Sequence, residues 1–247
     1  MKKLLLFALV FATTLAFSQG KTLFEISMVK PKTGQFSTFE SSWKAHLAKF
    51  HNGDDKRTVY EILSGPYTGY YYLVEGPMSY ADMDKERPNN AMHDQDYEKT
   101  VAHHLQDEGV TNIFSLRDSL SYNTDIQADK FVVTVTQIKD GKMSEYLQEA
   151  RRATMLSTKI KAPFGQTTFV QSFAGSNPVV VRVRTLKDGF KELETNYNNR
   201  PPTIFRDSYL KEHSQEQWDK RVKLLEESEK SREVHLMKLR KDLSSKQ

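Results

Sequence analysis

The chain has 247 residues, with 36 lysines and arginines against 32 aspartates and glutamates, and it contains no cysteine. The lack of cysteine excludes disulfide bonds, thiol catalysis, thiolate metal sites and lipoprotein attachment. The formal net charge of +4 is spread over mixed helix faces, without the basic stripe interleaved with aromatic residues that a nucleic-acid surface needs, so we expect no nucleic-acid partner.

The N-terminus has the pattern of a secretory signal peptide. Two lysines precede an apolar run, Leu4–Phe17, and Ala16 and Ser18 supply small residues at the two positions that a signal peptidase reads. The run is shorter than the roughly 20 residues of a membrane-spanning helix, and a retained anchor is the alternative. We expect residues 1–18 to be removed, which leaves a secreted or periplasmic protein that begins at Gln19 and is not stably inserted in a membrane.

The next part of the chain predicts one α+β module. Apolar and polar residues alternate over Leu23–Val29, as in a strand, and apolar residues then recur every three or four positions over Phe36–Phe50, as on one face of a helix. The later expected elements are strands at Thr58–Leu63 and Tyr70–Val74, a helical region with Tyr97, Val101, His104 and Leu105 on one side, and a strand at Val110–Leu116.

The rest of the chain repeats this order. Gly34–Phe39 is answered by Gly141–Tyr146, and Leu116–Ser121 is answered by Leu239–Ser244. The repeated elements are expected at Phe131–Ile138, Met143–Ser157, Thr167–Phe173, Val179–Arg184, Gln215–Glu229 and Glu233–Leu239. We therefore predict two modules, at 19–121 and 130–247, which are joined by a linker at 122–129. Turn-rich stretches inside each module, around Glu86–Asn90 and Asn196–Pro202, leave room for short extra helices.

The order β-α-β-β-α-β is that of a ferredoxin-like fold, with both helices on one face of an antiparallel sheet. Two such modules can cover each other's open face by packing sheet against sheet, so the predicted fold is two tandem ferredoxin-like modules in a pseudo-dimeric α/β barrel. In element order and duplication the chain resembles the dimeric α/β-barrel superfamily, which includes monooxygenases of the antibiotic-biosynthesis type and haem-degrading or haem-binding proteins. The resemblance implies a cavity between sheet and helices in each half, with haem as one cofactor to consider.

Differences between the two copies indicate where a site lies, because positions that only hold the fold should be apolar in both. Three residues of the first copy break the symmetry: Trp43 is opposite Ala150, His46 opposite Ala153 and His104 opposite Leu225. We expect the two histidines to project toward one cavity, where an imidazole serves as haem ligand, metal ligand or general base. The alternative is that each histidine is a hydrogen-bonded core or boundary residue.

Other residues are weaker candidates. Tyr71 offers a pocket hydroxyl, although tyrosines in a row along a strand must face opposite sides. A helical stripe of Asp96, His103 and Asp107 matches either a nitrogen and oxygen metal site or a solvated face, and we expect no metal site. Arg182 and Arg184 alternate with valines and suit either a carboxylate, such as a haem propionate, or an exposed strand surface.

These observations predict an exported, non-catalytic protein that binds a small apolar or aromatic ligand at Trp43, His46, His104 and Tyr71, with no catalytic residue assigned. One alternative is a monooxygenase or haem-handling enzyme of the same fold. The other is a structural partner of another envelope protein, which would expose an apolar patch of more than a few hundred Å².

Overall fold

A computed structural model describes residues 20–52, 55–85, 90–106, 109–198 and 201–246. Within these ranges, eight antiparallel strands form a closed barrel in the order β1-β3-β2-β8-β5-β7-β6-β4. The strands are β1 (Leu23–Val29), β2 (Arg57–Ile62), β3 (Tyr71–Met78), β4 (Val110–Leu116), β5 (Lys130–Ile138), β6 (Gly165–Gln171), β7 (Val179–Thr185) and β8 (Glu229–Leu239). The barrel closes through two pairings that join the halves of the chain, β2 with β8 and β4 with β6.

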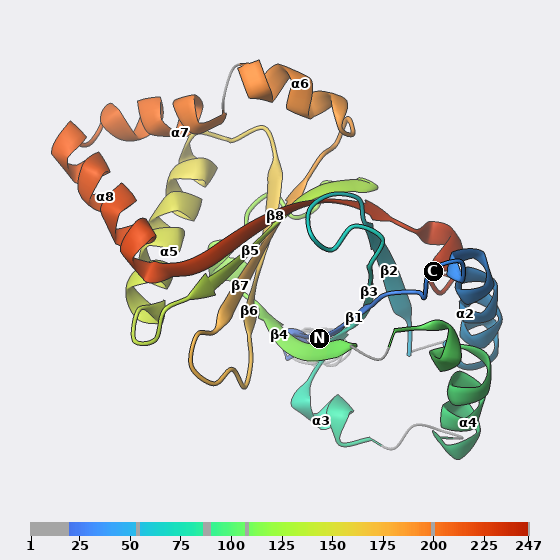
Figure 1. Cartoon of the computed structure of the whole chain (residues 1–247). Coiled ribbons are helices and arrows are strands. Elements are labelled where there is room, and N and C mark those ends of the chain that lie inside the picture. The colour runs from blue at the N-terminus through green and yellow to red at the C-terminus, as the bar shows by residue number, and fades with distance from the viewer. Residues whose placement is uncertain (1–19, 53–54, 86–89, 107–108, 199–200, 247) are drawn as a thin grey trace, which may run out of the picture.

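Helices cover the outside of this barrel in two separate groups (Figure 1). The first half of the chain contributes α2 (Phe36–Phe50), α3 (Tyr80–Met83) and α4 (Asn90–Thr100), followed by the 3-10 helices η1 (Ala102–His104) and η2 (Asp118–Leu120). The second half contributes α5 (Met143–Lys159), α6 (Lys191–Asn198), α7 (Pro201–Leu210), α8 (Gln215–Ser228) and the 3-10 helix η3 (Lys241–Leu243). No helix within the described residues is both long and apolar enough to cross a membrane.

Strand alternation divides the apolar side chains between the barrel interior and the outer helix layers. On β3, Tyr72 faces the interior, whereas Tyr71 and Leu73 pack outward against α2. The interior is filled by one cluster around Ile62, Phe114, Val133, Val181 and Met237. Two further clusters lie under the helices, one around Phe39 and Trp43 in the first half and one around Tyr146 and Ile138 in the second.

Each half ends in a short segment that packs onto the other half. Leu120 of η2 belongs to the cluster under the second-half helices, and Leu243 of η3 belongs to the cluster under the first-half helices. Hydrogen bonds follow the same pattern, because Ser121 Oγ accepts from the main chain of Thr168 at 2.9 Å and Ser244 Oγ accepts from the main chain of Val59 at 3.0 Å. The two halves therefore exchange their C-terminal segments.

The sequence located most elements correctly. The strands Leu23–Val29 and Val110–Leu116 and the helix Phe36–Phe50 have the expected bounds, and the α+β barrel is confirmed. One expectation was wrong: the face through Tyr97 does not continue as a helix to His104, because α4 ends at Thr100 and a 3-10 turn follows. The stretch around Asn196–Pro202 does hold helical residues, and the expected signal peptide lies outside the described residues.

Candidate metal centre

A cavity of about 140 Å³ lies in the first half, between the outer face of the sheet and helices α2 and α4. Strands β1, β2 and β3 supply one wall and the two helices supply the other. The lining residues are Glu25, Ser27, Trp43, His46, His51, Arg57, Leu73, His93 and Tyr97. The resemblance to α/β-barrel proteins implied a cavity at this place in the fold.

Three histidines converge at this cavity. His46 lies on the buried face of α2, His51 directly follows α2, and His93 lies on α4. The Nε2 atom of His93 is 3.2 Å from Nε2 of His46 and 3.3 Å from Nε2 of His51, and one ring nitrogen from each of the three residues falls within 4.8 Å of the others. The side chains of His46 and His51 are 1% and 2% exposed, so the cluster is closed to water on the α2 side.

Local structure explains how the two α2 histidines meet. Phe39, Trp43, His46 and Leu47 recur at helical spacing, so His46 takes an inward position otherwise filled by core residues. The chain leaves the helix at His51, whose main-chain N–H donates to the carbonyl oxygen of Leu47 at 2.9 Å. That change of direction turns the imidazole of His51 back beside the last turn of α2.

Each histidine presents its other ring nitrogen, Nδ1, to an aspartate. The Nδ1 atom lies 2.9 Å from a carboxylate oxygen of Asp96 for His46 and 2.9 Å from one of Asp94 for His93. For His51, both the carboxylate and the main-chain oxygen of Asp55 are 3.3 Å away. Carboxylate and carbonyl oxygens only accept hydrogen bonds, so all three Nδ1 atoms carry the proton.

Whenever the three rings are neutral, this tautomer leaves the three Nε2 atoms as acceptors facing one another. Burial lowers the pKa of His46, the hydrogen bond with Asp96 opposes that shift, and the neighbouring His51 and His93 add to it. Neutral imidazoles whose lone pairs converge repel one another unless a cation lies between them. Histidine that donates Nδ1–H to a carboxylate while offering Nε2 is the usual arrangement in protein metal sites.

The separations also match a metal ion. Nitrogen ligands about 2.0–2.1 Å from a tetrahedral Zn²⁺ ion are about 3.3–3.4 Å apart, close to the 3.2 Å and 3.3 Å observed here. Aromatic rings hold the cluster in place. Trp43 packs in a tilted arrangement against His46 and His51, with ring centroids 5.9 Å and 6.1 Å away, and Tyr97 meets His46 edge-on at 5.6 Å. Two of the three separations therefore suit a shared metal ion, and the histidines line the cavity, which leaves room for a further ligand.

The structure brings together two of the four residues singled out from the sequence. Trp43 and His46 line the cavity, whereas Tyr71 and His104 are not among its lining residues. The imidazole of His104 instead lies against His103, with ring centroids 3.8 Å apart, and its Nδ1 is 3.0 Å from the side-chain oxygen of Gln35. The expectation that His46 and His104 share one cavity was therefore wrong.

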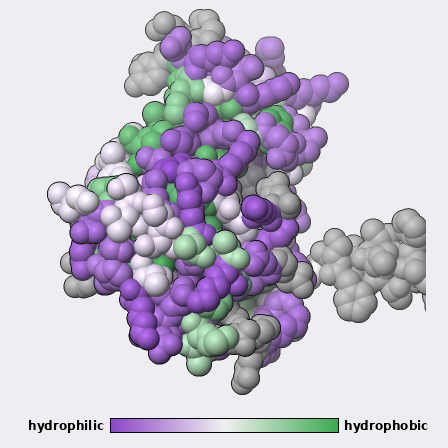
Figure 2. All heavy atoms as spheres, turned by 90° about the vertical axis from the view of Figure 1, so that its right-hand side faces the viewer, coloured by the Kyte–Doolittle hydropathy of each residue, from purple (hydrophilic) through white to green (hydrophobic). Residues whose placement is uncertain are grey.

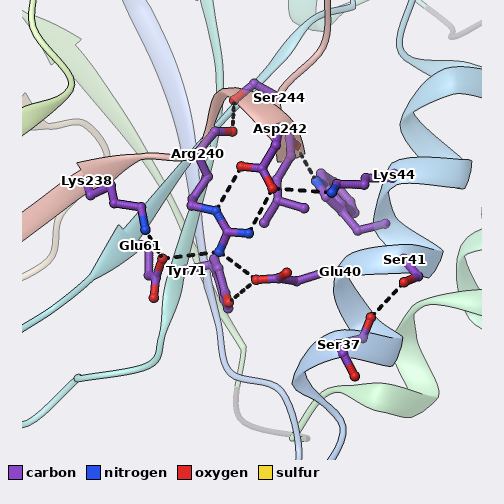
Figure 3. Close-up of polar contacts among 12 residues, drawn as sticks. Ser37, Glu40, Ser41, Lys44, Glu61, Tyr71, Lys238, Arg240, Asp242 and Ser244 are labelled. Carbon is purple, nitrogen blue, oxygen red and sulfur yellow. Dashed lines mark hydrogen bonds and ion pairs between the residues drawn. The ribbon is translucent and has the colours of Figure 1, made fainter.

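Tyr71 takes part in an ion-pair network at the junction of the two halves (Figure 3). Its hydroxyl donates to Glu40 at 2.8 Å, and Glu40 in turn binds Arg240 at 2.6 Å. Burial, and then the hydrogen bond to Glu40, raises the pKa of Tyr71 well above its ordinary value. Tyr71 thus holds the C-terminal segment against α2 rather than offering its hydroxyl to a ligand.

Sequence reasoning missed His51 and His93. The stripe of Asp96, His103 and Asp107 was divided by the structure, since Asp96 belongs to the centre, His103 lies elsewhere and Asp107 is outside the described residues. A usable signal was present, because His93 and Asp96 lie one helical turn apart. The expected absence of a metal site stays untested, but the geometry favours the opposite.

Haem does not fit this centre. Pockets for molecules of that size measure roughly 300–1,000 Å³, well above the 140 Å³ of this cavity. A haem bound to one of the three histidines would also displace the other two, because Nε2 of His93 lies only 3.2–3.3 Å from Nε2 of His46 and of His51.

Comparisons with known proteins show the fold. No protein-family model matches the chain, and no curated protein matches it. Among solved structures, it is similar to a proposed monooxygenase from Lactobacillus acidophilus NCFM (11% identity, TM-score 0.54, 92% of this chain and 97% of the other) and to an anthrone oxidase-like protein (12%, 0.56, 89% and 92%). It is also similar to chlorite dismutase from Candidatus Nitrospira defluvii in complex with imidazole (8%, 0.53, 90% and 92%). At these identities the likeness shows the α+β barrel fold alone.

Proposed function

We propose that the protein is an exported metal-binding protein that holds one divalent transition-metal ion on Nε2 of His46, His51 and His93. The observation that carries this proposal is the convergence of three Nε2 atoms whose Nδ1 partners are all aspartates. An imidazole donor set suits zinc, copper, nickel and iron, and excludes the calcium and magnesium that prefer oxygen ligands.

The fourth coordination position opens on the cavity, as in catalytic rather than structural zinc sites. A bound ion there supplies a Lewis acid that can hold water or one small molecule. The volume of 140 Å³ limits that molecule to a few non-hydrogen atoms, which refines the small-ligand function expected from the sequence. Atoms of hydrophilic residues cover most of the face that carries α2 and α4, with only small separate apolar groups (Figure 2), which supports ligand binding over protein docking on this face.

We also infer that the barrel arose by duplication into a pseudo-dimer of two ferredoxin-like modules. The strand order β4-β1-β3-β2 of the first half has the same chain order as β8-β5-β7-β6 of the second. The reciprocal exchange of Leu120 and Leu243 supports the same inference, because a symmetric dimer makes each contact twice.

An oxygenase is the second candidate function. The fold neighbours described as monooxygenase and oxidase-like support it, and a three-histidine ion with an open position is compatible with oxygen chemistry. Fold likeness alone is a weak guide to activity, so metal binding is the function to test first.

The test uses tag-free protein without residues 1–18, stripped of metal and titrated with Co²⁺, whose visible absorption reports nitrogen ligands and coordination number. We expect one ion per chain and a spectrum of four or five ligands. His51→Gln and His93→Gln should each weaken binding at least about 100-fold, more than the loss of a supporting hydrogen bond costs.

His103→Gln and His213→Gln are the matched controls, because both side chains are exposed and lie outside the centre. They should bind Co²⁺ as the unaltered protein does. The proposal is wrong if the unaltered protein shows no Co²⁺ spectrum at equimolar metal, or if His93→Gln binds as tightly as His103→Gln.

A further inference from the structure

Two arginines on β7 face the helix layer of the second half. Val181 and Val183 belong to the cluster inside the barrel, so the alternating residues Arg182 and Arg184 must lie on the outer face. There Arg182 lies over the ring of Tyr146, with 6.0 Å from guanidinium carbon to ring centroid, and Arg184 lies over Phe164 at 4.6 Å. Both side chains are partly buried, and β7 lies beside α5 on the left of Figure 1.

These two arginines differ from the other well-buried arginines of the described chain. Arg57 pairs with Glu25 and Glu75, Arg221 pairs with Glu149 at 2.5 Å, and Arg240 pairs with Glu40. In the part of the chain that the structure describes, Arg182 and Arg184 form no ion pair, and the Nε atom of each is buried without a hydrogen-bond partner. Each Nε–H group has lost contact with water without gaining a partner in the described chain, which costs free energy, and an anion from outside the chain would supply the missing acceptor.

Two hydroxyl groups on the same layer are also without partners. The side chains of Tyr146 and Thr136 are only 1% and 0% exposed, and their hydroxyl groups have no hydrogen-bond partner among the described residues. Thr136 lies on β5 and pairs with Val180, one position along the outer face from Arg182. Two arginine Nε groups and two hydroxyl groups of this layer therefore lack a hydrogen-bond acceptor among the described residues.

This patch occupies the position in the second half that the metal cavity occupies in the first. Leu73 of β3 lines the metal cavity and pairs with Ser27 of β1 and Val59 of β2. Arg182 of β7 has the equivalent position in the second half, because it pairs with Thr134 of β5 and Thr168 of β6. On the helix side, the repeat places Ala150 and Ala153 where α2 carries Trp43 and His46. The second half thus has two alanines in place of the tryptophan and histidine, and it adds two positively charged side chains on the sheet.

We propose that the second half binds a small carboxylate ligand through Arg182 and Arg184, with the hydroxyls of Tyr146 and Thr136 as further donors. A planar guanidinium matches a carboxylate in a two-bond geometry, and a carboxylate has lone pairs enough for four donors. Glu192 faces Arg184 closely enough to affect it electrostatically, and it offsets part of the positive charge. A single negative charge therefore suits the site better than the double charge of phosphate, and the rings of Tyr146 and Phe164 suit a ligand with an apolar body.

The experiment measures binding of benzoate to the full mature chain by calorimetry at low ionic strength, with benzamide as the uncharged analogue and inorganic phosphate as the competing anion. We expect benzoate to bind, benzamide to bind at least about tenfold more weakly, and phosphate not to displace benzoate at equal concentration. Arg182→Gln and Arg184→Gln should each weaken benzoate binding about tenfold or more.

Arg206→Gln is the matched control, because Arg206 is an exposed residue on α7 of the same half, outside the proposed site, and the variant should leave affinity within about twofold. A melting temperature that stays the same or rises in ligand-free Arg184→Gln shows that the variant folds and that the arginine was held at a cost to stability. The proposal is overturned if benzoate does not bind, if benzamide or phosphate binds as tightly as benzoate, or if Arg206→Gln weakens binding as much as Arg182→Gln. It does not depend on the metal centre, since a protein that binds no Co²⁺ still gives either result.

Discussion

The indole Nε1 of Trp43 donates a hydrogen bond to the main-chain oxygen of Leu243 at 2.9 Å, although 200 residues separate the two. In the second half, the hydroxyl of Thr168 donates to the main-chain oxygen of Leu120 at 2.7 Å. Each C-terminal segment therefore closes the helix layer of the opposite half. Trp43 links the C-terminal segment to the candidate metal centre, because its ring also packs against two of the three histidines.

This exchange predicts that the two halves unfold together. Leu243 and Leu120 are 0% and 4% exposed, so Leu243→Ala and Leu120→Ala should each lower the free energy of unfolding by about 2–5 kcal/mol. Denaturant unfolding followed by circular dichroism should show one transition in both variants, because either segment stabilises the half to which it does not belong. Two separated transitions, with only one of them moved by Leu243→Ala, would show that the halves fold independently.

Trp43 also predicts a fluorescence signal for metal binding. The chain has two tryptophans, and Trp218 lies on α8 in the other half. Paramagnetic Co²⁺ at the three histidines should quench the emission of Trp43 and leave that of Trp218 unchanged. In Trp43→Phe, the remaining emission should not respond to the metal. Equal quenching in Trp43→Phe would place the bound ion away from His46 and His51.

Local periodicity explains why the elements were predictable and the site was not. The strand Leu23–Val29 and the helix Phe36–Phe50 were identified because alternate or three-to-four spacing reports which face is buried. His51 gave no such signal, since it follows the last helical turn, where the side-chain direction depends on how the chain leaves the helix. His93 lies on α4, which buries no residue of its own, so its contact with His46 depends on tertiary packing alone.

The comparison of the two copies was informative but incomplete. It selected Trp43 and His46, which line the cavity, because each stands opposite an alanine. It also selected His104, which differs from Leu225 for a local reason: the chain forms a 3-10 turn there and the imidazole bonds Gln35. A difference between the two proposed copies marks a position to examine, and only geometry distinguishes a site from a changed turn.

The Arg240 network predicts a pH-dependent contribution to stability. Arg240 lowers the pKa of Glu40 and of Asp242, so this stabilisation is fully present above the ordinary carboxyl pKa near 4 and is lost as the pH falls through the lowered values. Arg240→Met should cost about 1–3 kcal/mol at pH 7, because it leaves partly buried carboxylates without their cation. The difference in stability between the unaltered protein and Arg240→Met should shrink as the pH is lowered from 5 toward 2. A difference that stays constant over that range would assign the loss to packing alone.

Variants of Asp96 and His104 test whether the metal centre lies at the three histidines or around η1. Asp96 accepts from His46 at 2.9 Å and from Lys49 at 2.7 Å, and Lys49, followed by His46, lowers the pKa of its carboxyl. Asp96→Asn keeps the shape but removes the charge that holds Nδ1–H of His46 in place, and the loss of such a partner weakens metal affinity about 10–100-fold. His104→Leu removes one partly exposed hydrogen bond to Gln35, so it should cost no more than about 1 kcal/mol and leave Co²⁺ affinity unchanged. Calorimetric titration of both variants with Co²⁺, together with their melting temperatures, checks this pair. Loss of metal affinity in His104→Leu with unchanged affinity in Asp96→Asn would move the centre from the three histidines to the residues around η1.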